Sequence, residues 1–383
     1  MLHCHPGPLL GPTGLLLIAV GCATSSPAPV AAVEATGPAE EASAASPAEE
    51  LVTGPPATWK DALERYSSTC PVPFFTLKTP EPISAGGRAF TLSGSALALQ
   101  GGKWEGPLKL GVLGAVKDAD DDTRQNLKKA AAAFHKAGVH FVVANGDLTG
   151  NEAGALVPVV EMLGEEFSAE RMPGGVAVPV FAHSGNYEWT SAFTQAFAER
   201  AVTWPHLFNM NVIRDVDFGG VHLVSLPGYF NRRFLQSGAC HYSDVDVADL
   251  TRHAQGLAAR GETVILTSHG PPLGTTATAL DVTSDGPNVG DPQLNGLLTD
   301  GKIAFGIFSH ILEAGGRAVD DVAGTSAVRL PMKAPRQHLY VNAGASSSFG
   351  WGMVSGKTSR GMAAIVTIDP TASTGHVEFI ELR

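Results

Sequence analysis

Short apolar runs of strand length constrain the fold of this chain more than any other feature of its sequence. They lie at 108–113, 140–144, 176–182, 221–226, 263–267 and 303–308, and segments with helical spacing lie at 123–137 and 245–259. Apolar runs that alternate with helices predict an α/β fold in which the strands are buried on both faces. A short helix at 58–69, a strand or hairpin at 88–99 and later strands at 338–342, 363–368 and 376–382 complete the expected elements.

Four of the apolar runs are followed by a side chain that can bind a metal. Asp147 follows the second run, Asn186 the third, His269 the fifth and His310 the sixth. Functional groups of α/β sheets collect beyond the carboxyl ends of the strands, so these four side chains are expected to meet there. One carboxylate, one amide oxygen and two imidazoles suit zinc, manganese or iron. The sequence therefore predicts a site for one divalent ion.

The order of these motifs resembles that of the calcineurin-like metallophosphoesterases, which run D-x-H, G-D-x-x, G-N-H-[DE], H and G-H-x-H. The resemblance covers about residues 108–350 and extends to a closing strand and small-residue turn at 340–346. It implies an α/β/β/α sandwich, with mostly buried β-sheets flanked by helices. Residues 108–383 would form that domain, and residues 58–107 an N-terminal helix and hairpin extension. Within the family, Asp147, Asn186, His269 and His310 correspond to the complete ligand set of one metal of a pair.

Three of the four ligands of the other metal are missing. Ala115 and Lys117 stand at the Asp and His of the first motif, and Leu312 stands at the second His of the last. Alanine and leucine offer no lone pair, and a lysine ammonium repels a dication. The family histidine of G-N-H-[DE] is Tyr187 here. We therefore expect a single metal ion, with the charge of Lys117 balancing the free side of Asp147.

Three functions are compatible with such a half-site. In the first, the domain is a weak one-metal phosphoesterase, in which Lys117 and Tyr187 act at the family His positions. In the second, it is an inactive relative that binds a phosphate-containing small molecule or a partner in the cleft that corresponds to the family's active site. In the third, the four polar side chains are structural and bind no metal. A further alternative is an active phosphomonoesterase or phosphodiesterase with substitute ligands, for which Asp118 and the run 120–122 are the nearest carboxylates.

The N-terminus resembles that of an exported lipoprotein. The apolar run 15–20 is too short to span a bilayer, has the length of a signal-peptide core, and ends in Gly21-Cys22. Cys22 is the expected lipidation site after removal of the signal at 1–22, and ordinary secretion is the alternative. Residues 23–57 carry five glutamates, several prolines and no lysine or arginine, which predicts a disordered tether. The domain is thus expected to face the periplasm or the cell surface, anchored by its lipid.

The cysteines and the net charge bear on disulfide bonding and on the binding partners of the chain. Cys70 and Cys240 are left in the mature chain, where an oxidising compartment permits a disulfide but two buried thiols fit equally well. The formal charge of −11 argues against broad electrostatic binding to nucleic acid or to an anionic membrane surface.

Several other side chains have simpler structural explanations. His183 and His222 are expected in the core, and His253 is expected to be solvent-exposed on its helix. Arg233 is interpreted as part of a surface loop that could reach a phosphate, and Trp351 as either a packed aromatic or a cleft residue.

Overall fold

The structure of the chain, a computed structural model, describes residues 54–149 and 156–383, and these belong to one compact unit. The predicted signal peptide, Cys22 and most of the tether lie outside the described residues. No helix in the described ranges is long and apolar enough to cross a membrane.

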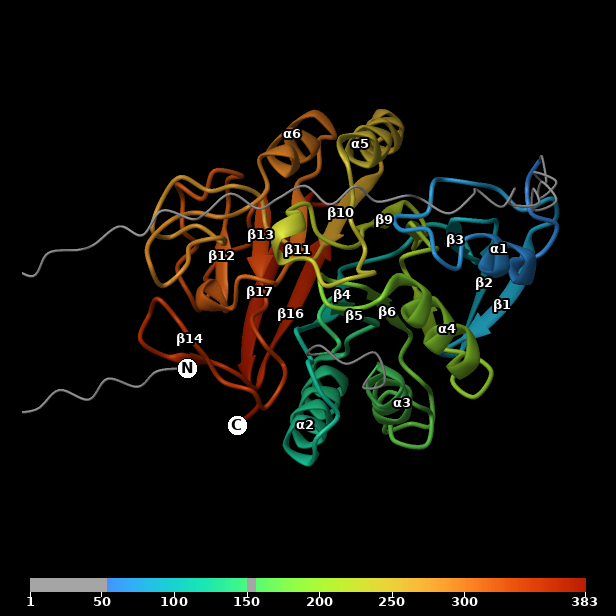
Figure 1. Ribbon diagram of the computed structural model, residues 1–383, viewed down its shortest axis with the longest axis horizontal. Helices are drawn as coiled ribbons and strands as arrows, with labels where there is room; N and C mark the ends of the chain where they lie inside the picture. The colour runs from blue at the N-terminus through green and yellow to red at the C-terminus, as the bar shows by residue number, and fades with distance from the viewer. Residues whose placement is uncertain (1–53, 150–155) are drawn as a thin grey trace, which may run out of the picture. The chain divides into compact units, whose positions relative to one another are not determined.

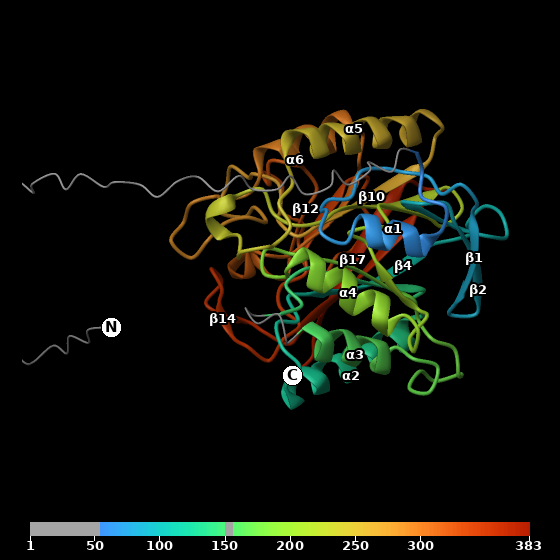
Figure 2. The same cartoon turned by 45° about the vertical axis from the view of Figure 1, so that its right-hand side comes forward.

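Two large sheets form the centre of this unit (Figures 1 and 2). The nine-stranded sheet has the order β1 (Glu81–Ala85), β2 (Arg88–Leu92), β3 (Ala96–Leu99), β8 (Asp215–Asp217), β9 (Val221–Leu226), β10 (Thr263–Ser268), β11 (Phe305–Phe308), β13 (Leu339–Asn342) and β12 (Arg317–Val319). The six-stranded sheet has the order β17 (Thr374–Glu381), β16 (Met362–Asp369), β4 (Leu108–Gly114), β5 (Phe141–Asn145), β6 (Val180–His183) and β7 (Leu207–Asn209). A hairpin of β14 (Trp351–Gly352) and β15 (Thr358–Ser359) stands apart from both.

The two sheets pack face to face, and helices cover their outer faces. Alternate residues of β5 show why: Val143 belongs to the core shared by both sheets, whereas Val142 and Ala144 belong to the core beneath the helices. On the six-stranded sheet these helices are α2 (Asp121–Ala137), α3 (Leu156–Glu166) and α4 (Thr190–Arg200). On the nine-stranded sheet they are α5 (Asp244–Ala259) and α6 (Pro292–Asp300). The expected α/β/β/α sandwich is therefore confirmed.

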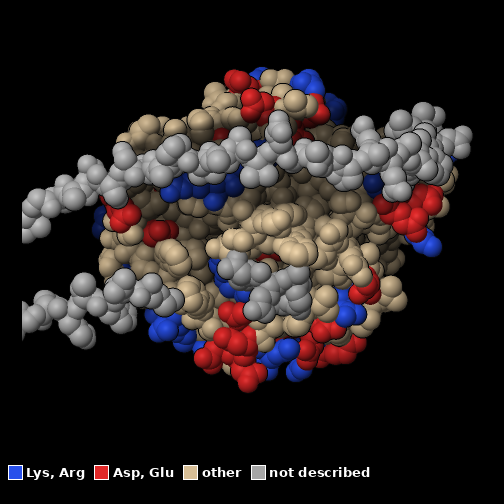
Figure 3. Space-filling view, viewed as in Figure 1, with Lys and Arg blue, Asp and Glu red and all other residues tan. Residues whose placement is uncertain are grey.

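The segment before β4 continues the nine-stranded sheet. The short helix α1 (Trp59–Arg65) begins at a capping box formed by Thr58 and Asp61, and β3 pairs in parallel with β8. On the outer side, acidic and basic side chains are interspersed over α2, α3 and α5, as expected for solvated helix faces (Figure 3).

Cys70 and Cys240 form a disulfide, which decides between the two alternatives that the sequence left open. The bond joins the segment after α1 to the segment before α5, across 170 residues of chain.

Replacing both cysteines by serine is expected to lower the free energy of unfolding by about 2–5 kcal/mol, because a crosslink between distant residues restricts the unfolded chain. Urea unfolding of the full chain measures this difference. An unchanged free energy of unfolding would show that the crosslink does not stabilise the fold.

A charged cluster fixes α5 to β8 and β9, two interior strands of the nine-stranded sheet. Asp215 accepts a hydrogen bond from His222 Nδ1 (2.9 Å) and one from His253 Nε2 (2.8 Å). The expectation that His253 is solvent-exposed is wrong: its ring is half-buried and stacks on Phe74, with centroids 4.3 Å apart. Helical spacing predicts exposure only where nothing packs on that face, and here the segment around Phe74 does.

This cluster predicts a pH-dependent stability. Burial lowers the pKa of His222, but its bond to Asp215 and the charges of Asp215, Asp217 and Glu262 outweigh burial and raise it above 6.5. Burial raises the pKa of Asp215, but its two histidine bonds outweigh burial and lower it below 3.8. The His222 contribution is fully present below pH 6.5 and is lost as pH rises through its higher folded pKa. The Asp215 contribution is present above pH 3.8 and is lost as pH falls through its lower folded pKa.

We therefore expect the difference in Tm between wild type and His222→Gln to be largest between about pH 4 and 6.5 and to shrink above that range. Thermal unfolding in a pH series measures it. A difference that stays constant from pH 5 to 9 would exclude a charged His222.

Candidate metal centre

The four predicted donors meet at one edge of the sandwich, and they come from both sheets. Asp147 and Asn186 follow β5 and β6 of the six-stranded sheet, whereas His269 and His310 follow β10 and β11 of the nine-stranded sheet. Because the sheets are stacked, their parallel strands end side by side at this edge.

His269 Nε2 lies at the centre of the group. It is 3.1 Å from Asp147 Oδ1, 3.1 Å from Asn186 Oδ1 and 3.1 Å from His310 Nδ1. Donor atoms of Asp147, His269 and His310 all lie within 4.8 Å of one another. Asp147 and His269 are buried, and His310 is partly buried.

Their hydrogen bonds direct lone pairs to the same point. His269 Nδ1 lies 3.2 Å from the carbonyl oxygen of Asn145, which only accepts; a proton on Nδ1 satisfies this contact and leaves the Nε2 lone pair for an ion. Asn186 Nδ2 donates to the carbonyl oxygen of Phe234 (2.7 Å), which directs Oδ1 towards His269. Asp147 Oδ1 is buried and has no hydrogen bond within the described part of the chain. Converging lone pairs around an orphaned carboxylate oxygen are the environment that a cation satisfies, so these residues fit a divalent ion.

The backbone at this edge adopts conformations that side chains seldom tolerate. Of the six non-glycine residues with positive φ in the described ranges, four lie at the centre: Ala115, Lys117, Asp147 and His310. A side chain at Gly185 would come within 2.6 Å of Asp147 Oδ1, and one at Gly146 would collide with His269. Strained positions cluster where function fixes the geometry, and the two motif glycines allow the donors to approach closely.

Two buried polar residues hold the strand ends together. Glu188 accepts hydrogen bonds from the backbone nitrogens of Thr149 (3.0 Å) and Gly185 (2.7 Å), which ties the Asp147 loop to the Asn186 loop. Asn145 Nδ2 contacts Thr267 Oγ1, the carbonyl oxygen of Ser268 and that of Ile307, which ties one sheet to the other. The donors are therefore preorganised by a second layer of bonds.

The space on the other side of Asp147, where a second metal ion would bind, is occupied by side chains. Lys117 Nζ lies 2.5 Å from Asp147 Oδ2, on the oxygen that does not face His269, and 4.1 Å from the centre of the Tyr187 ring. Ala115 and Leu312 pack with Ala345 as a small buried apolar cluster. The three positions at which the sequence resemblance places the ligands of a second metal thus hold an ammonium group and a hydrocarbon contact.

The charges agree with this arrangement. Burial raises the pKa of Asp147, but His269 and Lys117 outweigh burial and hold it far below its usual range. Burial lowers the pKa of Lys117, but Asp147 outweighs burial and raises it, so the ammonium stays charged. Burial, followed by the neighbouring His269, lowers the pKa of His310 to about 3, so its imidazole is neutral and can act as a ligand.

The acidic run after β4 supplies no ligand to this group. Asp120 caps α2 by accepting from the backbone nitrogen of Thr123 (2.6 Å), and it also accepts from Ser348 Oγ (2.8 Å). Asp121 and Asp122 are exposed in the first turn of the helix, where carboxylates favour the helix dipole. Among the described residues, the only group of three or more clustered acidic, His or Cys side chains is that of Asp147, His269 and His310. Asp118 lines the cleft beside Lys117 but does not belong to this group, so neither Asp118 nor the run 120–122 joins the donors around His269.

A cleft of about 880 Å³ opens onto the centre, and Lys117, Asp147, Asn186 and His310 line it. Both Arg233 and Trp351, whose places the sequence left open, line this cleft as well. Tyr229 was missed: its ring packs on His310, with centroids 4.1 Å apart. It follows β9 after Pro227-Gly228, so the same strand-end signal would have found it.

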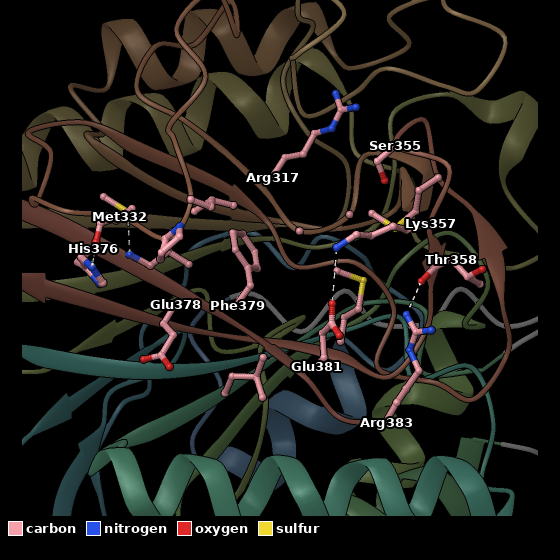
Figure 4. Close-up of a pocket in the computed structure, with 18 residues that line it drawn as sticks. Arg317, Met332, Ser355, Lys357, Thr358, His376, Glu378, Phe379, Glu381 and Arg383 are labelled. Atoms are coloured by element: carbon pink, nitrogen blue, oxygen red, sulfur yellow. Dashed lines mark hydrogen bonds and ion pairs between the residues drawn. The ribbon is translucent and has the colours of Figure 1, made fainter.

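A second hollow of about 670 Å³ lies along β17 (Figure 4). Its polar groups mostly bind one another: Lys357 Nζ lies 3.8 Å from Glu381, and Arg383 donates to the carbonyl oxygen of Thr358. It presents no convergent set of free donors comparable to the metal centre.

No protein-family model matches the sequence, and no curated protein matches it. Solved structures of similar arrangement include a dimetal phosphatase from Danio rerio, which is 12% identical with a TM-score of 0.44 over 73% of this chain and 100% of that chain. Another is GAP50, the anchor in the inner membrane complex of Plasmodium, at 14% identity and a TM-score of 0.48 over 73% of this chain and 86% of that chain. A third is a protein of Thermus thermophilus, at 12% identity and a TM-score of 0.45 over 72% of this chain and 99% of that chain. At such values these likenesses say nothing about the activity of this chain.

Proposed function

We propose that this chain binds one divalent ion through Asp147, Asn186, His269 and His310 and uses this ion, together with Lys117, to hold a phosphate group in the cleft. It would thus be a weakened relative of the calcineurin-like metallophosphoesterases that binds its ligand and turns it over slowly or not at all. The observation that carries this proposal is the contact of Lys117 Nζ with Asp147 Oδ2 (2.5 Å), where a second ion would need that oxygen.

A site with one metal ion in place of two limits the hydrolysis of a phosphate ester. Two-metal phosphoesterases hold the attacking and the leaving oxygen of an in-line displacement between their ions. One ion supplies a positive charge to a phosphate oxygen and lowers the pKa of a bound water. Lys117 adds a second positive charge from the side, and Tyr187 can donate a hydrogen bond from its hydroxyl group. These groups bind and orient a phosphate well, but they do not replace the two-ion clamp.

The second candidate is a one-metal phosphoesterase, and the cleft itself favours it. Asp147, Asn186 and His310 line the cleft, so one side of an ion held there would face the ligand, as in catalytic metal sites. The export of the chain as a lipid-anchored protein is part of the same proposal, with the cleft outside the cytoplasm, where Cys70 and Cys240 can stay oxidised.

Metal analysis and turnover together test the proposal on the full chain. We expect one equivalent of Mn²⁺ or Zn²⁺ and little or no hydrolysis of bis-p-nitrophenyl phosphate. Turnover that disappears in Asp147→Ala would establish the second candidate instead. Two equivalents in the wild type would overturn the half-site, and no bound metal at all would make the four side chains structural.

A further inference from the structure

Three aromatic side chains of the cleft that opens onto the candidate metal centre are exposed to solvent. Phe234 is 47% exposed, Phe349 is 56% exposed and Trp351 is 44% exposed, and all three line the cleft. Single exposed apolar residues are common on protein surfaces, but several that share a cleft with a few polar groups indicate a ligand site.

Phe349 and Trp351 stand on a segment that is held from both sides. Their ring centroids are 6.3 Å apart. Before them, Ser348 binds the start of α2, with its backbone nitrogen 2.9 Å from Thr123 Oγ1. After them, the backbone nitrogen of Val354 donates to the carbonyl oxygen of Glu313 (3.0 Å), next to Leu312 at the start of a short 3-10 helix. The two rings are therefore presented on a fixed hairpin and not on a free loop.

Phe234 is coupled directly to the metal centre. Its carbonyl oxygen is the acceptor that orients the amide of Asn186, so its backbone position sets one metal donor. The neighbouring Arg233 also lines the cleft and lies 5.8 Å from the Phe234 ring. Cations and aromatic surface thus occur together on this segment, as they do at Lys117 and Tyr187.

We propose that the cleft takes a phosphate monoester whose alcohol part is apolar, with the phosphate at the metal ion and Lys117 and the apolar part on Phe234, Phe349 and Trp351. This inference rests on the proposed function, because it needs a phosphate held at the centre. The aromatic side chains then determine specificity: they favour an ester with a large apolar group over inorganic phosphate or a small alkyl ester, which leave their surface in water.

Four probes test this site on the full chain with one equivalent of Mn²⁺. 1-Naphthyl phosphate carries both features, methyl phosphate lacks the large apolar group, and 1-naphthol lacks the phosphate; n-octyl phosphate distinguishes an aromatic from an aliphatic preference. Calorimetry is expected to show 1-naphthyl phosphate binding about tenfold or more tighter than methyl phosphate. Trp351→Ala should remove this preference while leaving methyl phosphate unchanged, and Trp351→Phe should restore most of it. Leu330→Ala, which truncates an exposed apolar side chain in the second hollow along β17, is the matched control and should change neither affinity.

The outcomes separate this inference from the function on which it rests. Equal affinities for both esters, or a preference that survives Trp351→Ala, would overturn the apolar subsite and leave the metal-and-phosphate site standing. If 1-naphthol binds as well as its phosphate and methyl phosphate does not bind at all, the proposed phosphate function fails and the aromatic surface serves another ligand. An unchanged metal content and an unchanged affinity for methyl phosphate show that a variant is correctly folded.

Discussion

His269→Ala is expected to lower the affinity for Mn²⁺ or Zn²⁺ by more than about 100-fold. Removal of an outer-shell partner lowers metal affinity by up to about 100-fold, and the loss of a direct ligand should exceed that. His269 Nε2 lies 3.1 Å from a donor atom of each of the other three residues. Its removal takes away the donor that faces Asp147 Oδ1 and leaves Asp147 paired with Lys117 through Oδ2. Metal titration by calorimetry measures the loss.

Thermal unfolding gives an independent measurement of the same effect. An ion that binds only the folded state stabilises it by about 2.7 kcal/mol at 100 times its Kd. Added metal should therefore raise the Tm of the wild type and leave that of His269→Ala unchanged. His135→Ala is the matched control, because His135 is exposed on α2 and its variant should respond to metal as the wild type does. A normal metal response in His269→Ala would place the ion elsewhere.

The strands and the metal donors follow from the sequence because both depend on local pattern. An apolar run such as 263–267 needs burial on both faces, and a polar residue directly after it must lie at the end of a strand. The structure has β10 at Thr263–Ser268, with His269 next in the chain. Several other elements lack such a pattern. Strand β8 spans only Asp215–Asp217, and α3 has a proline in its first turn, where the helical signal is weak.

The aromatic wall of the cleft depends on contacts between distant segments, which a pattern does not encode. Gly350 and Gly352 around Trp351 indicate a turn, but they do not show that Ser348 binds the start of α2 and so directs the segment into the cleft. The side chains at the three positions Ala115, Lys117 and Leu312 illustrate both cases. The sequence predicts the pairing of Lys117 with Asp147, whereas the packing of Ala115 on Leu312 depends on how β4 and the end of β11 approach each other.

The triple variant Ala115→Asp, Lys117→His and Leu312→His is expected to bind two equivalents of metal and to hydrolyse bis-p-nitrophenyl phosphate. The substitutions return the three missing ligands of the family pattern and release Asp147 Oδ2 from the Lys117 ammonium. The backbone is suited to them: Ala115 has φ 30° and Lys117 has φ 68°, and Asp and His tolerate positive φ better than most residues. A second ion that stabilises the transferring phosphate contributes several kcal/mol, so hydrolysis should exceed that of the wild type by about 100-fold or more.

The same substitutions predict a stability that depends on metal. Ala115 is fully buried and Leu312 is 6% exposed, so a carboxylate and an imidazole at these positions are costly until an ion compensates them. We therefore expect the triple variant to melt below the wild type without metal and to gain more than the wild type when Mn²⁺ is added.

The double variant Ala115→Asp and Leu312→His, which keeps Lys117, isolates the contribution of the lysine. If the ammonium occupies the place of the second ion, this variant binds one equivalent and hydrolyses no faster than the wild type, although it carries two of the three restored ligands. Two equivalents in the double variant would show that Lys117 yields its position to a metal, and the lost ligands alone would then explain the half-site. A triple variant that is folded and still binds one equivalent would mean that the cleft has lost the second site in its backbone and not only in its side chains.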